Sequence, residues 1–293
     1  MFTRFGIWDL KKLEFIFTKS KILILKSKII MKTLYIKEQL NRYFLFAALI
    51  LSLLFTTVNA NAQAKTAAPK IKNVVLVHGA FADGSGWQGL YQILTKKGYN
   101  VTIVQNPLSS LEDDVAATNL ALDKQDGPTI LVGHSWGGTV ITEAGNHPKV
   151  AALVYVAALQ PDNGENSIQW LQTAPPAPEN GVLPPDDKGI AYYDKAKFHA
   201  GFAGDLSKEQ ADFMFASQGA FHAKGFGTPI TKAAWRDKPS YGIVATEDKS
   251  INPDIERAMY KRSNTKITEI KGSHVVFISQ PAKVANVIIE ASK

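Results

Sequence analysis

From residue 72 onward, short apolar runs alternate with longer stretches in which apolar residues recur every three or four positions. The runs at 73–77, 129–132 and 150–158 are almost continuously apolar, which is typical of strands covered on both faces of a sheet. Amphipathic stretches separate these runs, so that most predicted strands are followed by a predicted helix. This alternation favours βαβ units and a parallel sheet.

The pattern predicts six strands and five main helices. The strands are expected at 73–77, 101–104, 129–132, 150–158, 241–245 and 266–270. The helices are expected at 87–97, 111–124, 140–145, 253–261 and 281–291. Together they predict an α/β fold in which helices flank a mostly parallel sheet.

The regular alternation breaks between residues 160 and 239. Eight of the 14 prolines lie in this segment, together with a glycine-rich stretch near 219–227. Short helices at 191–198 and 208–218 fit its pattern. Because a long irregular insertion in a regular sheet is usually functional, we predict a mainly helical cap at about 160–239.

The N-terminal part of the chain has a different character. Residues 31–62 predict a secretory signal peptide, since Met31 opens a basic stretch and an apolar run follows at 43–55. The candidate cleavage sites follow Ala60, Ala62 and Ala64. The apolar run is shorter than the ~20 residues that span a bilayer, although an uncleaved anchor is the alternative. We expect an exported bacterial protein, periplasmic or secreted, with no stable membrane anchoring after cleavage.

Residues 1–30 consist mostly of Lys, Ile, Phe and Leu and contain no Ala, Val or Pro. We interpret this segment as upstream sequence translated from an over-early start, with Met31 as the true start. An unusually long basic region of the signal peptide is the alternative. Residues 63–71 are expected to form a linker to the main domain, which spans 72–293.

The net charge and the lack of cysteine narrow the possible functions of this 293-residue chain. The formal net charge is +7, but residues 1–62 hold ten basic and three acidic residues, so the remainder is formally neutral. The sequence therefore predicts no nucleic-acid partner. Without cysteine, the chain has no disulfide, thiolate metal site or cysteine nucleophile. Phosphate-loop and zinc-protease motifs are also missing, and we expect neither a cofactor nor a metal.

The candidate chemistry begins directly after the third predicted strand. Gly133, Ser135 and Gly137 form a G-x-S-x-G pattern between a predicted strand and a predicted helix. A sharp turn of this kind needs small residues two positions before and after the serine, and it projects the serine Oγ from the sheet. We predict Ser135 as a nucleophile. A glycine-rich turn that binds phosphate is the alternative.

A serine hydroxyl needs a base that removes its proton. This strand–turn–helix motif sets the chain order serine, acid, histidine. Of the six histidines, only His274 follows the last predicted strand. The acid is expected after the strand at 241–245, where Glu247 and Asp248 are neighbours. We prefer Asp248 because it lies later in the loop, and Glu247 is the alternative.

An oxyanion hole requires two backbone N–H donors directed at the developing negative charge. One is expected from Trp136, directly after the candidate nucleophile. The other is expected from Ala80, in the loop after the first predicted strand, with Phe81 as the alternate donor.

These segments resemble the α/β-hydrolase superfamily. The resemblance rests on His78-Gly79-Ala80, Gly133-His134-Ser135-Trp136-Gly137-Gly138, Thr246-Glu247-Asp248 and Ser273-His274, and it covers about residues 70–293. The short His-Gly-Ala loop and the downstream Trp87 are similar to the branch of plant methyl-ester esterases, hydroxynitrile lyases and their small bacterial relatives. The resemblance implies a cap that roofs the pocket. The proline-rich insertion departs from the plant pattern, so the plant substrates are not implied.

Three functions are compatible with these residues. The first is an exported serine hydrolase that cleaves a small-molecule carboxylic ester through an acyl-enzyme. The second is a C–C lyase of the hydroxynitrile-lyase type, or a perhydrolase of the haloperoxidase type, on the same triad. A pocket lysine would favour a lyase, and Lys249 is the candidate. The third is a non-enzymatic protein that binds a small ligand. Most aromatic residues of the predicted cap are expected to pack it on the sheet and the others to line the pocket, which favours a hydrophobic acyl or aryl ester.

Overall fold

The computed structural model describes residue 20, residues 26–43 and residues 71–293. Residues 26–43 are helical, and Arg42 pairs there with Glu38 one turn earlier. In the part of the chain that the structure describes, no helix has both the length and the apolar character needed to cross a bilayer. The predicted cleavage sites lie outside the described residues, as does the apolar run at 43–55 except for its first residue.

Six parallel strands form the main sheet. Its order is β2-β1-β3-β4-β7-β8, with β1 (Asn73–Val77), β2 (Asn100–Val104), β3 (Thr129–His134), β4 (Val150–Val156), β7 (Ser240–Ala245) and β8 (Lys266–Ile270). Every neighbouring pair of these strands is parallel. The predicted α/β class with a parallel sheet is therefore confirmed, and the observed strand ends lie within two residues of the predicted ones.

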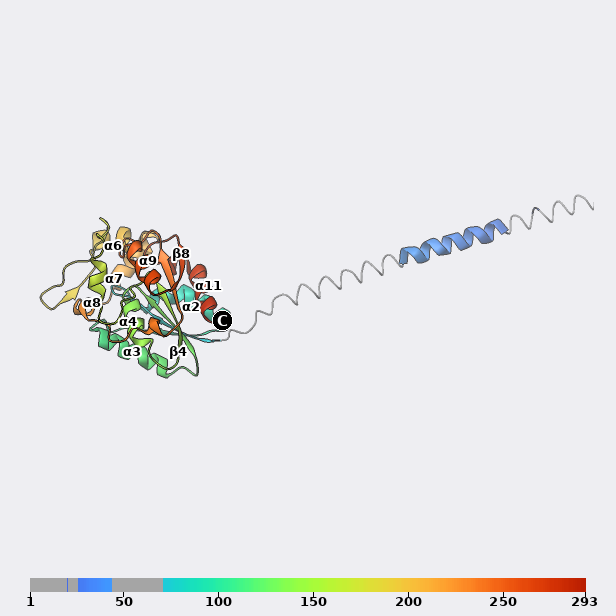
Figure 1. Cartoon of the computed structure of the whole chain (residues 1–293). Coiled ribbons are helices and arrows are strands. Elements are labelled where there is room, and N and C mark those ends of the chain that lie inside the picture. Colours follow the sequence, from blue (N-terminus) through green and yellow to red (C-terminus); the bar gives the residue numbers. More distant parts are fainter. Residues whose placement is uncertain (1–19, 21–25, 44–70) are drawn as a thin grey trace, which may run out of the picture. The chain divides into compact units, whose positions relative to one another are not determined.

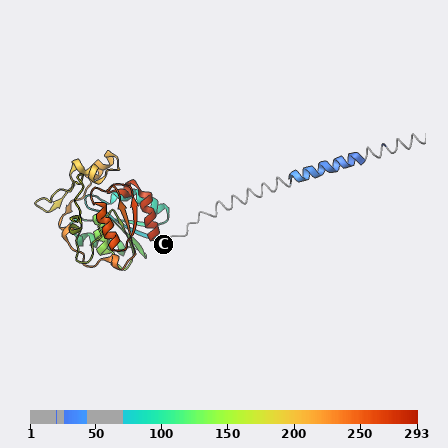
Figure 2. The same cartoon turned by 45° about the horizontal axis from the view of Figure 1, so that its top comes forward.

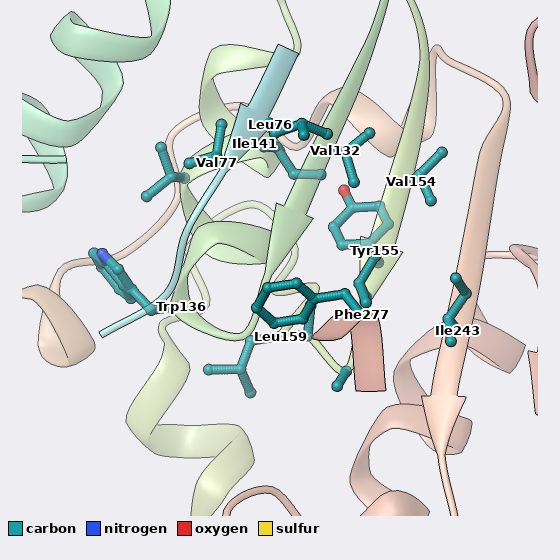
Figure 3. Packing of buried hydrophobic residues seen from close by; sticks show 14 of the residues in the cluster. Leu76, Val77, Val132, Trp136, Ile141, Val154, Tyr155, Leu159, Ile243 and Phe277 are labelled. Atoms are coloured by element: carbon teal, nitrogen blue, oxygen red, sulfur yellow. The ribbon is translucent and has the colours of Figure 1, made fainter. Parts of the chain in front are cut away.

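Burial differs between the centre and the edges of the sheet. All residues of β1 and β3 are buried, whereas the edge strand β8 exposes three of its five residues. Leu76, Val132 and Val154 lie side by side in register on β1, β3 and β4, as Figure 3 shows. Because both faces of the central strands are covered, their sequences are continuously apolar and carry a strong strand signal.

Helices pack on both faces of the sheet (Figure 1). On one face α2 (Gln88–Lys96) packs against α11 (Pro281–Ala291), with the short α10 (Val276–Ser279) beside them. On the other face α3 (Leu111–Asp123) packs against α4 (Trp136–Ala144). The helix α9 (Pro253–Arg262) contacts β7 and β8, and a 3₁₀ turn, η1 (Gly84–Trp87), precedes α2.

The segment between β4 and β7 forms a cap of short elements. It contains α5 (Ser167–Leu171), β5 (Ile190–Ala191), α6 (Lys195–Phe202), α7 (Lys208–Ala216), β6 (Phe221–His222), α8 (Lys224–Gly227) and η2 (Ala234–Arg236). Figure 2 shows the yellow and orange helices α6 and α7 gathered at one end of the sheet. This placement puts the cap beside the loops that follow the strands.

One predicted cap helix begins later than the sequence pattern indicates. The helix expected at 191–198 starts at Lys195, because Ala191 pairs with Phe221 in the antiparallel β5–β6 ladder. Asp194 then caps the helix by accepting a hydrogen bond from the Ala196 amide at 2.8 Å. The pairing partner of Ala191 lies thirty residues away, so the local pattern does not reveal it.

Candidate active site

Three predicted site residues meet beyond the carboxyl ends of β3, β7 and β8. Ser135 directly follows β3, Asp248 follows β7, and His274 follows β8. Ser135 Oγ lies 2.8 Å from His274 Nε2, and His274 Nδ1 lies 2.6 Å from Asp248 Oδ2. All three residues are buried. The fold thus joins side chains from distant parts of the chain into one hydrogen-bonded series.

The partners of His274 define the proton positions in this series. The Asp248 carboxylate accepts hydrogen bonds, so His274 Nδ1–H donates to it. The lone pair of Nε2 is then directed at the Ser135 hydroxyl. Asp248 Oδ1 also accepts the amides of Ser250 and Ile251, at 2.7 and 3.0 Å, which orients the carboxylate. In this state the imidazole can accept the serine proton.

The alternative acid, Glu247, does not reach His274. Its side chain is exposed and lies 3.5 Å from Lys271 Nζ. Its backbone amide donates to the Gly272 carbonyl at 3.0 Å, which ties the acid loop to the histidine loop. The structure therefore places Asp248 rather than Glu247 against the imidazole.

Close backbone packing surrounds Ser135. The residue has φ 54° and ψ −120°, a conformation that is strained for a residue with a side chain. A Cβ at Gly133 would lie 2.4 Å from the Gly137 carbonyl oxygen, and one at Gly137 would lie 2.6 Å from the Val77 carbonyl oxygen. Both glycines are therefore required by space, as the predicted sharp turn implies.

The loop that carries the candidate oxyanion donors is held by His78. Its Nδ1–H donates to the Gly79 carbonyl and its Nε2 accepts the Asn106 amide, both at 2.9 Å. Burial lowers the pKa of His78, which favours this neutral form. Ala80 and Phe81 line the same cavity as Ser135, and Phe81 has a positive φ of 58°. The roles of the Ala80, Phe81 and Trp136 amides stay predictions.

Asp114, in the first turn of α3, supports the site. Its Oδ2 accepts the indole N–H of Trp136 at 2.8 Å, and its Oδ1 accepts the Leu108 amide at 2.7 Å. Burial raises the pKa of Asp114, and these hydrogen bonds oppose the shift. The sequence carries no signal for this role, because the contact joins α3 to the start of α4.

His134 lies directly behind His274. Its Nε2–H donates to the His274 carbonyl at 2.9 Å, and the two ring centroids are 4.7 Å apart. Burial, with a contribution from the neighbouring His274, lowers the pKa of His134 well below its usual range. His134 is therefore a neutral donor that holds the main chain of His274.

A cavity of about 500 Å³ lies beside Ser135 and His274. Its walls are mainly apolar, and the cap contributes Tyr193, Phe202 and Phe226. The polar lining residues beyond Ser135, His274 and Tyr193 are Gln172, Asn180, Ser250 and Asn252. None of the lining residues is Asp, Glu, Lys or Arg, and Lys249 is not among them. The cavity therefore suits an uncharged, largely apolar molecule.

Metal ligands do not gather in the described chain. Within residues 26–43 and 71–293, no group of three or more His, Cys, Asp or Glu side chains could hold a metal ion.

Known proteins that resemble this chain match it from about residue 74 onward. A profile of the alpha/beta hydrolase family matches residues 74–287. A pyrethroid hydrolase of Sphingobium wenxiniae is 25% identical over 249 residues, which cover 75% of this chain and 87% of that protein. A carbendazim hydrolyzing esterase of a Nocardioides species is 30% identical over 118 residues, or 36% of this chain and 49% of that protein.

Solved structures show the same fold. The crystal structure of polyneuridine aldehyde esterase superposes with a TM-score of 0.65 at 18% identity, covering 76% of this chain and all of that chain. The predicted resemblance to the α/β-hydrolase superfamily is confirmed by the family match and by these relatives.

Proposed function

Because the chain belongs to the alpha/beta hydrolase family, we propose that it is an exported serine hydrolase that cleaves a carboxylic ester through an acyl-enzyme intermediate. The observation that carries this proposal is the hydrogen-bonded series from Ser135 Oγ through His274 to Asp248, with distances of 2.8 and 2.6 Å. The esterase and hydrolase names of the relatives support the same reaction class.

In the proposed mechanism, Ser135 Oγ attacks the ester carbonyl carbon while His274 Nε2 takes the hydroxyl proton. Asp248 stabilises the resulting imidazolium. Backbone amides of Trp136 and of Ala80 or Phe81 stabilise the negative charge on the carbonyl oxygen. The alcohol leaves with the proton from His274 and the acyl group stays on the serine. Water, deprotonated by His274, then releases the acid, so that ester and water become acid and alcohol.

The cavity supports a substrate class for this reaction. Its lining is mainly apolar and holds no Asp, Glu, Lys or Arg, so a charged ester would lose hydration without gaining a charged partner. A volume of about 500 Å³ accommodates a bulky molecule. We therefore assign the site an uncharged ester with a hydrophobic acyl or aryl group.

No specific feature favours the lyase alternative. Lys249, the lysine that would support it, does not line the cavity. Among the described residues, no other Lys and no Arg lines the cavity beside Ser135.

The export part of the proposal rests on the leader. The basic stretch, the apolar run and the small residues at 31–64 support secretion and cleavage. A formally neutral catalytic domain agrees with a small-molecule substrate rather than a polyanionic partner.

The test combines turnover with labelling of the purified protein. A panel of esters that varies in acyl size, alcohol size and charge should show fastest hydrolysis of bulky uncharged esters. A serine-directed phosphonate should label the protein, and Ser135→Ala should abolish both labelling and turnover. Ser109→Ala removes an exposed serine outside the cavity and serves as the control. Equal labelling of the Ser135→Ala variant overturns the mechanism, and labelling without multiple turnovers supports a binding protein.

A further inference from the structure

We propose that Asp205, in the cap, is a positioning residue for His274 and that the cap thereby sets the geometry of the triad as well as covering the cavity. The inference rests on the proposed serine-hydrolase function. Asp205 does not line the cavity, so its action on the reaction passes through the loop that carries the histidine.

One carboxylate collects three hydrogen bonds from that loop. Asp205 Oδ2 accepts the Ser273 amide at 2.9 Å, and Oδ1 accepts the Ser273 hydroxyl at 2.5 Å. Oδ2 also accepts the hydroxyl of Ser279 at 2.6 Å. Ser273 directly precedes His274. The helix α10 begins two residues after His274, and Ser279 is its last residue. The carboxylate therefore holds the chain on both sides of the histidine.

The turn that presents Asp205 is itself fixed. It follows α6, and the Leu206 amide closes it by donating to the Ala203 carbonyl at 3.0 Å. His199 Nε2–H, from α6, donates to the Leu206 carbonyl at 2.9 Å. Asp205 thus projects from a closed turn, although the residue is exposed to solvent.

The same end of α6 touches the imidazole directly. The ring of Phe202 meets the ring of His274 edge to face, with centroids 4.9 Å apart. Phe202 is fully buried, and its neighbour Gly201 is tightly packed, since a Cβ there would lie 2.2 Å from the Glu179 carbonyl oxygen. A movement of this helix end would therefore reach the imidazole in two ways, through the ring contact of Phe202 and through the loop that carries His274.

The helix end also contacts the loop of Asp248. Ser250 Oγ donates to the Gly201 carbonyl at 2.9 Å, while the Ser250 amide donates to Asp248 Oδ1 at 2.7 Å. The residues from Gly201 to Asp205 consequently join the acid loop to the histidine loop.

The expected effect follows from the demands of proton transfer. Misplacement of a reacting group by about 1 Å can lower a rate about 100-fold. Removing the carboxylate leaves the triad side chains and the cavity lining intact but takes away three of the hydrogen bonds that hold the chain around His274. We therefore expect Asp205→Ala to lower kcat by about 10- to 100-fold while KM changes by less than about twofold.

The first experiment compares matched substitutions in the full chain. Asp205→Ala is measured against Asp212→Ala, which removes an exposed aspartate of the same cap that pairs with Lys208 on α7. Asp205→Asn keeps one acceptor oxygen and should restore part of kcat. Thermal unfolding midpoints of both alanine variants should stay near that of the wild type. Equal kcat in Asp205→Ala and Asp212→Ala overturns the inference.

A double-mutant cycle separates positioning from general stabilisation. Ser279→Ala removes one donor to Asp205 that does not line the cavity, and it should lower kcat on its own. In the Asp205→Ala background the same change should have no further effect, because the contact is already lost. Fully additive losses, or a lowered unfolding midpoint with unchanged kcat, contradict a positioning role.

The two proposals fail in different ways. If the wild type hydrolyses no ester, or if Ser135→Ala retains turnover, the proposed function fails. If turnover depends on Ser135 but not on Asp205, only the positioning role fails.

Discussion

Ser135 occupies a backbone position that only its neighbours make possible. The positive φ of this residue is held between β3 and α4, where two glycines allow the chains to approach. Val77 ends the adjacent strand β1, and its carbonyl lies where a side chain at Gly137 would project. The turn and the first strand are therefore packed as one unit.

Gly137→Ala should be destabilising, because the new Cβ would lie 2.6 Å from the Val77 carbonyl oxygen. Overpacking of a dense interior costs about 1–3 kcal/mol, and we expect at least that loss in urea unfolding together with lower activity. Gly227→Ala is the matched control, since a Cβ there meets no atom within 4 Å. Equal unfolding midpoints for the two variants would show that the turn can relax.

Glu256, on α9, is a buried carboxyl whose electrostatic neighbour is Asp248, the predicted triad acid. Burial, with a contribution from the charge of Asp248, holds the pKa of Glu256 well above its usual range. The folded protein therefore keeps this proton at pH values where the unfolded chain has lost it. The contribution of Glu256 to stability is present at acidic pH and declines as pH rises above the ordinary carboxyl pKa of about 4.3.

Glu256→Gln should therefore gain stability relative to wild type as pH rises, by at most about 1.4 kcal/mol per pH unit. Chemical unfolding at pH 5, 6 and 7 measures the trend. Glu269→Gln should show no such trend over this range, because the hydrogen bond from Arg257 lowers the pKa of Glu269 and its contribution to stability declines only as pH falls below the ordinary carboxyl pKa of about 4.3. If the difference in unfolding free energy between wild type and Glu256→Gln does not change with pH, the pKa of Glu256 is not raised in the folded protein.

At the scale of elements, α5 is a short helix whose place depends on Arg262 of α9. Arg262 Nη1 contacts both oxygens of Glu165 at 2.6 and 2.8 Å, and its guanidinium carbon lies 4.6 Å from the Trp170 ring centroid. Trp170 Nε1–H also donates to Glu165 at 2.8 Å. Because Ile168 and Leu171 of α5 line the cavity, this cluster positions one cavity wall.

Arg262→Lys should raise KM for esters with large acyl groups more than for small ones, with kcat little changed. A lysine cannot reproduce the planar stacking on Trp170 together with the separate Nη2 hydrogen bond to the Gln160 carbonyl at 3.1 Å. Steady-state kinetics across an acyl series measures the effect. The control is Lys261→Ala, an exposed neighbour on the same helix. A uniform change in KM for all esters would show that α5 does not select by size.

At the scale of the whole molecule, the charge separates the predicted leader from the hydrolase domain. The excess positive charge lies in residues 1–62, while the domain that holds Ser135 is formally neutral. If the proposed export is correct, the charge bears on where the protein is sent and not on the chemistry of the site.

We expect the exported protein to begin at Asn61, Gln63 or Lys65, directly after one of the small residues that permit cleavage. N-terminal sequencing of the protein recovered from periplasm or medium measures this. Recovery of the intact chain in the membrane fraction would instead support an uncleaved anchor.

The start of translation has its own test. If Met31 is the true start, replacing the Met1 codon should leave expression and export unchanged. Western blotting of the native gene product measures both. Loss of expression on this change would show that residues 1–30 are translated as a long basic region of the leader.

The sequence by itself determined the local elements and the order of the predicted triad. Doubly covered strands such as β1 and β3 are continuously apolar, and the turn at Ser135 needs its two glycines, so both features are visible in neighbouring residues. His274 was predicted as the base from chain order, because it is the only histidine after the last predicted strand.

Only the tertiary structure decided which side chains meet across the sheet edge. Their order in the loop favoured Asp248 over its neighbour Glu247, but only the packed turn shows that Asp248 lies against His274 while Glu247 lies near Lys271. The contacts of Asp114 with Trp136 and of Asp205 with Ser273 join elements that are distant in sequence. Local periodicity reports which face of an element is buried, whereas partners across the fold depend on how the elements pack.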